Sequence, residues 1–202
     1  MTIISIKHGS DESLRRVELS DGSLFSFKTC YLHPVFNIAE GVEINEVEEE
    51  GLRFASACLR AEKTALRLIA RAEQTTMGLA RKLEKRGHDS ACVRHMISQL
   101  CESGLLDDRR YARLWLDARI SRQRTSPRRL LIALNARGID RDDTAFALKE
   151  ALDDDAEFLL LKRYAEKLHR KGKINSDDGR SLKYLLKSEG FSSLAIQRFL
   201  TE

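Results

Sequence analysis

Arginines dominate one stretch of this sequence. Between Asp117 and Asp140 the chain carries six arginines, no lysine and no acidic residue. A guanidinium group is a planar fork of N–H donors that can hold a phosphate or a carboxylate through two parallel hydrogen bonds. We therefore predict a surface that binds an anionic partner. The six residues are Arg119, Arg122, Arg124, Arg128, Arg129 and Arg137.

The middle of this stretch contains a helix start. Ser126-Pro127 has serine in the N-cap position and proline in the first helical position. Arg128 and Arg129 then fall in the first turn, where cations oppose the helix dipole, so we expect an anion to compensate for them. The alternative is an ordinary solvated surface on which arginine stems cover apolar side chains.

Two smaller basic clusters lie outside this stretch. Residues 1–60 hold 6 basic and 10 acidic side chains, whereas residues 61–202 hold 29 basic and 21 acidic ones. This asymmetry predicts that an anionic partner meets the second part of the chain. The first cluster is Arg81, Lys82, Lys85 and Arg86, and the second is Lys162, Arg163, Lys167, Arg170, Lys171 and Lys173.

One spacing is compatible with a metal site. His88, Cys92 and His95 could place three zinc-binding atoms on one face of a helix. No fourth ligand is apparent nearby in the sequence, and a structural cysteine beside a buried stripe is the simpler interpretation. The sequence also has no glycine-rich phosphate loop, no GxSxG and no HExxH. We predict a binding protein with no catalytic residues, no metal and no cofactor.

Three glycines indicate the elements that position these residues. Gly87, Gly138 and Gly190 are spaced 51 and 52 residues apart, and each follows leucines placed eight and four residues earlier. This is the pattern of a short amphipathic helix ended by glycine. The apolar periodicity restarts after each glycine in a further helix. A helical unit that occurs three times predicts a stack of repeats.

The aromatic residues of the middle unit admit two interpretations. Tyr111, Leu114, Trp115 and Ala118 are spaced as the buried stripe of one helix. Trp115 and Tyr111 could instead stack on nucleic-acid bases, although their helical spacing favours core packing.

The N-terminal residues are not helical in pattern. Alternating apolar residues on either side of Asp21-Gly22 predict a β-hairpin, in a sheet of two or three strands that docks on a neighbour. Residues 40–50 then contain six glutamates and no basic residue. They are expected to be an acidic helix start, or alternatively an internal decoy for the basic face.

We therefore predict a mainly α-helical fold of three tandem three-helix repeats that form an elongated curved body, with a small N-terminal β extension. Helices are expected from about Gly51 onwards, with Ser176 and Ser192 as the last two N-caps. The expected boundaries are 1–50 for the β extension and acidic linker, then 51–104, 105–152 and 153–202 for the repeats.

Several segments resemble the RecX family, whose members regulate the RecA recombinase. Residues 104–112 (GLLDDRRYA) are similar to the sequence that begins a RecX repeat unit. Residues 134–139 (LNARGI) are similar to the sequence that ends the pattern. Residues 79–83 (LARKL) followed by Gly87 match the first-unit pattern, and the hairpin at Asp21-Gly22 looks like the β extension of some members.

The resemblance implies a cytoplasmic, monomeric protein that is not an enzyme. It would lie in the groove of a RecA filament on single-stranded DNA and modulate, most simply inhibit, recombinase, ATPase and co-protease activities in DNA repair, homologous recombination and the SOS response. The residues alone leave two alternatives. One is a direct single- or double-stranded DNA-binding protein that competes for the strand, and the other is a helical adaptor without nucleic-acid contact.

Overall fold

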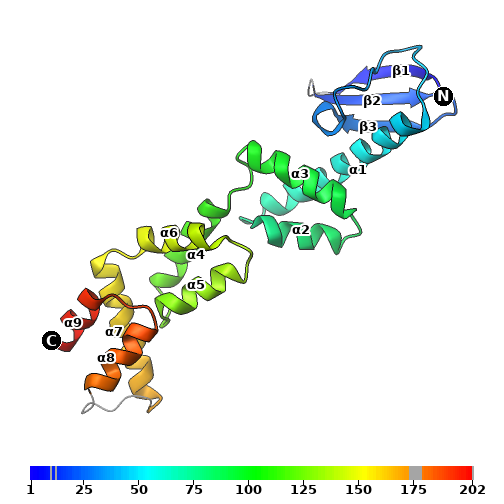
Figure 1. Cartoon of the computed structure of the whole chain (residues 1–202). Helices are drawn as coiled ribbons and strands as arrows, with labels where there is room; N and C mark the ends of the chain where they lie inside the picture. The colour runs from blue at the N-terminus through cyan, green and yellow to red at the C-terminus, as the bar shows by residue number, and fades with distance from the viewer. Residues whose placement is uncertain (10, 12, 173–178, 202) are drawn as a thin grey trace. The chain divides into compact units, whose positions relative to one another are not determined.

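The fold is that of a computed structural model, which describes residues 1–201 except 10, 12 and 173–178. Lys173 of the second basic cluster and the expected cap Ser176 lie outside the described residues. The chain divides into two compact units, Met1–Leu106 and Asp107–Glu202. The described part is mainly helical, with a small N-terminal antiparallel sheet, as predicted (Figure 1).

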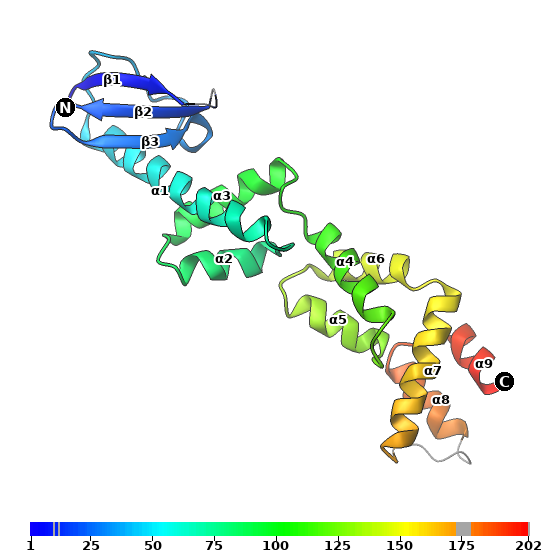
Figure 2. The same cartoon turned by 180° about the vertical axis from the view of Figure 1, so that it is seen from behind.

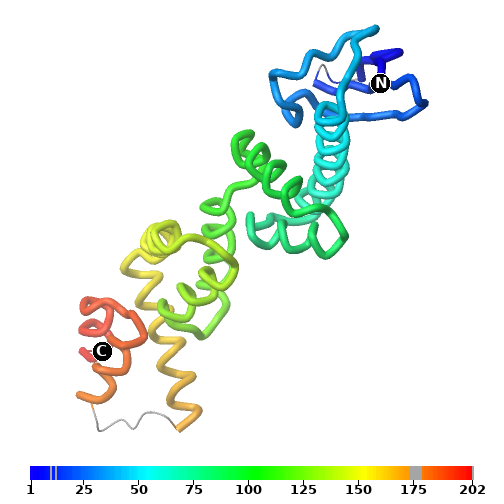
Figure 3. Tube along the Cα trace, turned by 45° about the vertical axis from the view of Figure 1, so that its right-hand side comes forward, coloured from blue at the N-terminus to red at the C-terminus, as the bar shows by residue number. Residues whose placement is uncertain are grey.

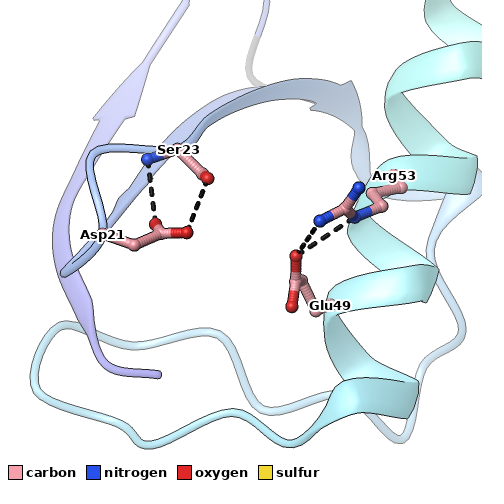
Figure 4. Close-up of polar contacts among 4 residues, drawn as sticks. All are labelled: Asp21, Ser23, Glu49 and Arg53. Atoms are coloured by element: carbon pink, nitrogen blue, oxygen red, sulfur yellow. Dashed lines mark hydrogen bonds and ion pairs between the residues drawn. The ribbon is translucent and has the colours of Figure 1, made fainter.

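The first unit begins with a sheet of three strands in the order β1-β2-β3. The strands are β1 (Ile3–His8), β2 (Leu14–Leu19) and β3 (Leu24–Lys28). At the turn between β2 and β3, the Asp21 carboxylate accepts hydrogen bonds from the backbone N–H and the hydroxyl of Ser23 (Figure 4). Gly22 takes the positive φ of 85° that this turn requires. The predicted hairpin is confirmed.

The glutamate-rich segment leads into a long helix, α1 (Glu46–Ile69). Asn45 and Glu48 form a reciprocal capping box, and Glu49 pairs with Arg53 one turn later (Figure 4). The acidic helix start is thus confirmed. The helix begins at Glu46, five residues before the expected Gly51, because the capping box fixes its N-terminus. Gly51 lies within the helix, where an added Cβ would come within 2.2 Å of the Phe36 ring.

The sheet docks on α1, which continues from the sheet to two shorter helices (Figure 3). These are α2 (Thr76–Glu84) and α3 (Ser90–Glu102). Val17, Phe27 and Leu52 belong to the same buried cluster as Leu83 and Met96, so the sheet and the three helices share one core. Lys28 and Glu62 join β3 to α1 by a salt bridge of 2.7 Å.

Helices are the one regular secondary structure in the described residues of the second unit (Figure 2). One core includes Leu116, Leu130 and Leu134 from its first helices and Leu161 and Ile196 from its last ones. The helices are α4 (Asp108–Ile120), α5 (Pro127–Asn135), α6 (Arg141–Ala151), α7 (Asp154–Arg170), α8 (Gly179–Ser188) and α9 (Ser193–Thr201).

The three glycine stops have the same geometry. Gly87, Gly138 and Gly190 have φ values of 83°, 86° and 89°. At each one, the N–H of the next residue bonds to the carbonyl of the leucine four residues before the glycine, at 3.2, 3.4 and 3.2 Å. This is the Schellman ending, in which glycine relieves the strain of the left-handed conformation. The repeated helix end predicted from the sequence is confirmed.

The predicted buried stripe of α4 is wrong. Leu114 is 47% exposed and Ala118 is exposed, while Tyr111 and Trp115 are only partly buried. The buried stripe is shifted by one residue, which rotates the helix by about 100°. The small Ala112 side chain lies at the start of the buried stripe, and α4 packs against α6. The buried residues are Ala112, Leu116 and Ile120.

Candidate functional site

The six arginines lie in the second unit, near the end of α4 and near both ends of α5. Arg119 is in the last turn of α4, and Arg128 and Arg129 are in the first turn of α5. The other three are in the connections on either side of α5, namely Arg122, Arg124 and Arg137.

Two of these arginines stack on one indole. The Cζ atom of Arg119 lies 3.8 Å, and that of Arg137 4.7 Å, from the centroid of the Trp115 ring. Burial and then the nearby positive charge of Arg137 lower the pKa of Arg119, while Tyr111 acts weakly in the opposite direction. Trp115 therefore holds two like charges close together, which favours an anion beside them.

A surface hollow of about 580 Å³ brings two sequence clusters together. One wall is the α4–α5 connection and the other is the end of α7. None of the described lining residues is acidic, and the two that are not basic can donate hydrogen bonds. The lining residues are Arg122, Gln123, Arg124, Thr125, Lys167, Arg170 and Lys171.

Cations of α7 hold the α4–α5 connection in place. Arg163 Nη1 donates to the carbonyl of Ser121 at 2.5 Å, and Lys167 Nζ donates to that of Arg124 at 2.8 Å. Burial first, and then the charges of Arg129 and Lys171, lower the pKa of Lys167.

The remaining cations of the hollow differ in how they are engaged. The Arg124 guanidinium lies 3.6 Å from Glu166, a loose and exposed ion pair. Arg122, Arg170 and Lys171 are exposed, and among the described residues no side-chain bond or ion pair is found for them. These three side chains are the ones most open to an anionic ligand.

The first turn of α5 has an internal partner at the end of α8. The backbone N–H of Arg128 donates to the carbonyl of Glu189 at 3.0 Å, and Arg129 Nε lies 3.8 Å from the Glu189 carboxylate. The buried Ser126 hydroxyl also donates to that carboxylate, so Ser126 occupies the N-cap position without capping the helix by its side chain. The anion expected at this helix start is therefore supplied at least in part by Glu189.

The other predicted basic residues are not brought into the hollow. Lys162 lies over the Phe158 ring, 4.6 Å from its centroid. The remaining four, Arg81, Lys82, Lys85 and Arg86, belong to the first unit, at the end of α2 and just beyond it. There Lys82 donates to Gln74 at 2.6 Å, and Arg86 donates to the Lys82 carbonyl at 2.8 Å.

His88, Cys92 and His95 do not share one helix face, because His88 precedes α3, while Cys92 and His95 have structural partners. The Cys92 thiol donates to the Phe54 carbonyl, and the His95 ring packs edge-on against Tyr31 and Phe54. Within the described residues, no group of three potential metal ligands is found. In the same residues, no helix has the length and apolar character needed to cross a bilayer.

Sequence reasoning missed part of this site. Gln123 and Thr125 carry no charge and gave no signal, although both line the hollow. Glu189 lies more than fifty residues beyond α5 and could not be connected to it from spacing alone.

Comparison with known proteins places these features in one family. The family model described as RecX, second three-helix domain, matches residues 107–148, which include α4 and α5. The regulatory protein RecX of Treponema pallidum (strain Nichols) is 38% identical over 119 residues, covering 59% of this chain and 73% of the relative. That of Pseudomonas fluorescens is 31% identical over 142 residues, covering 69% and 88%.

Solved structures agree in fold. A crystal structure of regulatory protein RecX aligns with a TM-score of 0.73 at 22% identity, covering 100% of this chain and 99% of the other. The structure of RecX from Lactobacillus salivarius aligns with a TM-score of 0.60 at 20% identity, covering 73% and 96%. With the sequence matches to named relatives, these findings show that the chain belongs to the RecX family of regulatory proteins.

Proposed function

We propose that this protein binds the RecA recombinase filament on single-stranded DNA and inhibits its activities. The observation that carries the proposal is the hollow between the α4–α5 connection and α7, lined by five cations. Family membership supports RecA as the partner. RecX proteins are regulatory and not enzymes, so the chain is a regulator without catalysis of its own.

The charge pattern of the second unit suits the groove of such a filament. DNA phosphates and acidic protein side chains are both anions that arginine and lysine bind. Arg119 and Arg137 on Trp115 would meet the acidic protein surface, and the open cations Arg122, Arg170 and Lys171 would lie nearest the phosphates. A monomer is sufficient for this arrangement, because both sets of residues belong to one unit of one chain.

A second candidate is direct DNA binding, with competition for the strand. The hollow favours it as well, because five cations can bind a phosphodiester backbone without any recombinase. The salt dependence of the binding affinity distinguishes the two candidates. Binding through six to ten phosphate contacts weakens about 10³- to 10⁵-fold between 50 and 200 mM salt, whereas a mixed protein interface weakens less steeply.

Two variants with the same change in net charge test the proposal. The hollow variant combines Arg122→Glu, Arg170→Glu and Lys171→Glu. The control variant combines Arg113→Glu, Arg141→Glu and Lys149→Glu, three exposed cations of the same unit that do not line the hollow.

Cosedimentation with a preassembled RecA–DNA filament measures their binding. The wild-type protein and the control variant are expected to pellet with the filament, and the hollow variant is expected to bind at least about tenfold more weakly, as close interfacial charges warrant. Equal pelleting of both variants would reject the hollow as the contact. Tight binding to free DNA that RecA does not change would favour the second candidate.

A further inference from the structure

The outer face of α8 carries an aromatic ring among cations. Arg180, Lys183, Tyr184 and Lys187 are spaced i, i+3, i+4 and i+7, which places them on one side of the helix. All four are exposed, and Tyr184 is 79% exposed. The helix itself contains no acidic residue. Asp177 and Asp178, which precede it in the sequence, lie outside the described residues.

The opposite face of α8 fixes the helix to its unit. Leu186 is fully buried in the core of the second unit, and Leu182 and Leu185 pack against that core. Because these leucines pack against the core of the second unit, the apolar face of α8 is directed at protein and not at a membrane surface. Its outer face is therefore the side turned away from the core, and Tyr184 takes no part in the core.

Tyr184 has no structural role that explains it. Among the described residues, no hydrogen bond, ring contact or cation–π contact is found for its side chain. A large ring that is almost fully exposed beside three cations matches the composition of a stacking platform for single strands, where a base lies on the ring and cations bind the flanking phosphates.

The choice of cations favours nucleic acid over an acidic protein. Two of the three are lysines, which bind phosphate as point charges but are depleted at protein–protein interfaces. A duplex keeps its bases stacked inside, where Tyr184 could not reach them, so the partner should be single-stranded.

We propose that the outer face of α8 binds single-stranded nucleic acid, with Tyr184 stacked on a base and Arg180, Lys183 and Lys187 on the phosphates around it. This surface goes beyond the proposed function, which depends on the hollow and the Trp115 arginines. It requires no recombinase, so Tyr184→Ala on free oligothymidine tests it, whereas the hollow variant on the RecA filament tests the proposed function.

Fluorescence anisotropy with a labelled 20-nucleotide oligothymidine tests the stacking. Tyr184→Ala is expected to weaken binding about 5- to 150-fold, the range that corresponds to loss of one base–aromatic stack. Tyr184→Phe keeps the ring and is expected to bind like the wild type. Phe146→Ala removes another exposed aromatic side chain of the same unit and serves as the control.

An abasic strand of the same length distinguishes stacking from charge. On this strand Tyr184→Ala and the wild type are expected to bind equally, because no base is left to stack. Replacing Lys183 and Lys187 by glutamine is expected to reduce the slope of log affinity against log salt by about 0.7 for each lost phosphate contact. Lys149→Gln should leave the slope unchanged.

Four results would overturn the proposal. The first two are unchanged oligothymidine binding by Tyr184→Ala and an equal loss of affinity of this variant on the abasic strand. The third is no oligothymidine binding by the wild type at 50 mM salt. The fourth is that Tyr184→Ala weakens binding only to RecA without DNA. The last result would identify α8 as a surface for an acidic protein.

Discussion

The guanidinium of Arg119 lies over the indole of Trp115, with 3.8 Å between Arg119 Cζ and the ring centroid. Arg137 approaches the same ring from the end of α5. The indole is therefore neither a fully buried core residue nor a bare platform for bases. It orients two cations, of which Arg137 also donates from Nη1 to the Ala133 carbonyl.

Trp115→Ala should destabilise the protein by about 2 kcal/mol, below the 3–5 kcal/mol typical of a fully buried tryptophan, because the ring is only partly buried. Urea unfolding followed by circular dichroism measures this. Leu116→Ala, at a fully buried neighbour, is the reference and should cost about 2–5 kcal/mol. A loss above about 4 kcal/mol for Trp115→Ala would place the indole in the core.

Trp115 is also the chain's one tryptophan, so its fluorescence reports on this site alone. Binding of the RecA filament should change the emission of Trp115, because an anion that engages Arg119 and Arg137 alters the surroundings of the ring. The control is the double variant Arg119→Gln, Arg137→Gln, whose emission should respond less. An unchanged spectrum at saturating filament would mean that the partner binds elsewhere.

Glu189→Ala should cost about 1–3 kcal/mol of stability. It leaves the buried Ser126 hydroxyl without its acceptor and Arg129 without its ion pair. Glu189→Gln retains an acceptor and should cost less, while it frees Arg129 to bind an external anion. Thermal unfolding measures both, and equal losses for the two variants would contradict a hydrogen bond to Ser126.

Two glycine stops should respond differently to alanine. At Gly87 an added Cβ meets nothing within 4 Å, so Gly87→Ala should cost only the left-handed strain of about 1–2 kcal/mol. At Gly190 the Cβ would lie 3.3 Å from the backbone nitrogen of Arg128, so Gly190→Ala should cost more. Equal shifts in the urea midpoint would show that α5 does not pack closely on this turn.

The four cysteines should divide by reactivity. Burial raises the pKa of Cys58 and of Cys92, so little thiolate forms at either position near neutral pH. Cys101 is exposed and should react rapidly with Ellman's reagent, whereas Cys30, whose pKa burial also raises, should react more slowly. Cys58 and Cys92 should react only after unfolding in urea. Rapid reaction of all four in the native protein would contradict the packing of α1 on α3.

Local features could be predicted from the sequence, because their causes are local. The glycine stops and the Asp21-Gly22 hairpin depend on residues within one or two turns. The buried stripe of α4 could not be predicted to the residue. Which arc of that helix faces the core depends on α6, more than twenty residues along the chain.

The candidate site also combines features with local causes and features that depend on the tertiary fold. The run of arginines was visible in the sequence, but the hollow was not, because it joins Arg122 to Lys167 and Arg170 across three helices. The bond from Ser126 to Glu189 spans 63 positions and likewise depends on the tertiary fold. The cations and the tyrosine of α8 have helical spacing in the sequence, but which side of α8 is buried depends on the core of the second unit.

The most direct test of the central claim is ATP hydrolysis by a RecA filament preassembled on single-stranded DNA and titrated with this protein. The wild type and the control variant (Arg113→Glu, Arg141→Glu, Lys149→Glu) should suppress hydrolysis at substoichiometric amounts. The hollow variant should need at least about tenfold more protein, as the loss of close interfacial charges warrants. No suppression by the wild type at equimolar protein, or equal suppression by the hollow variant, would contradict filament regulation through this surface.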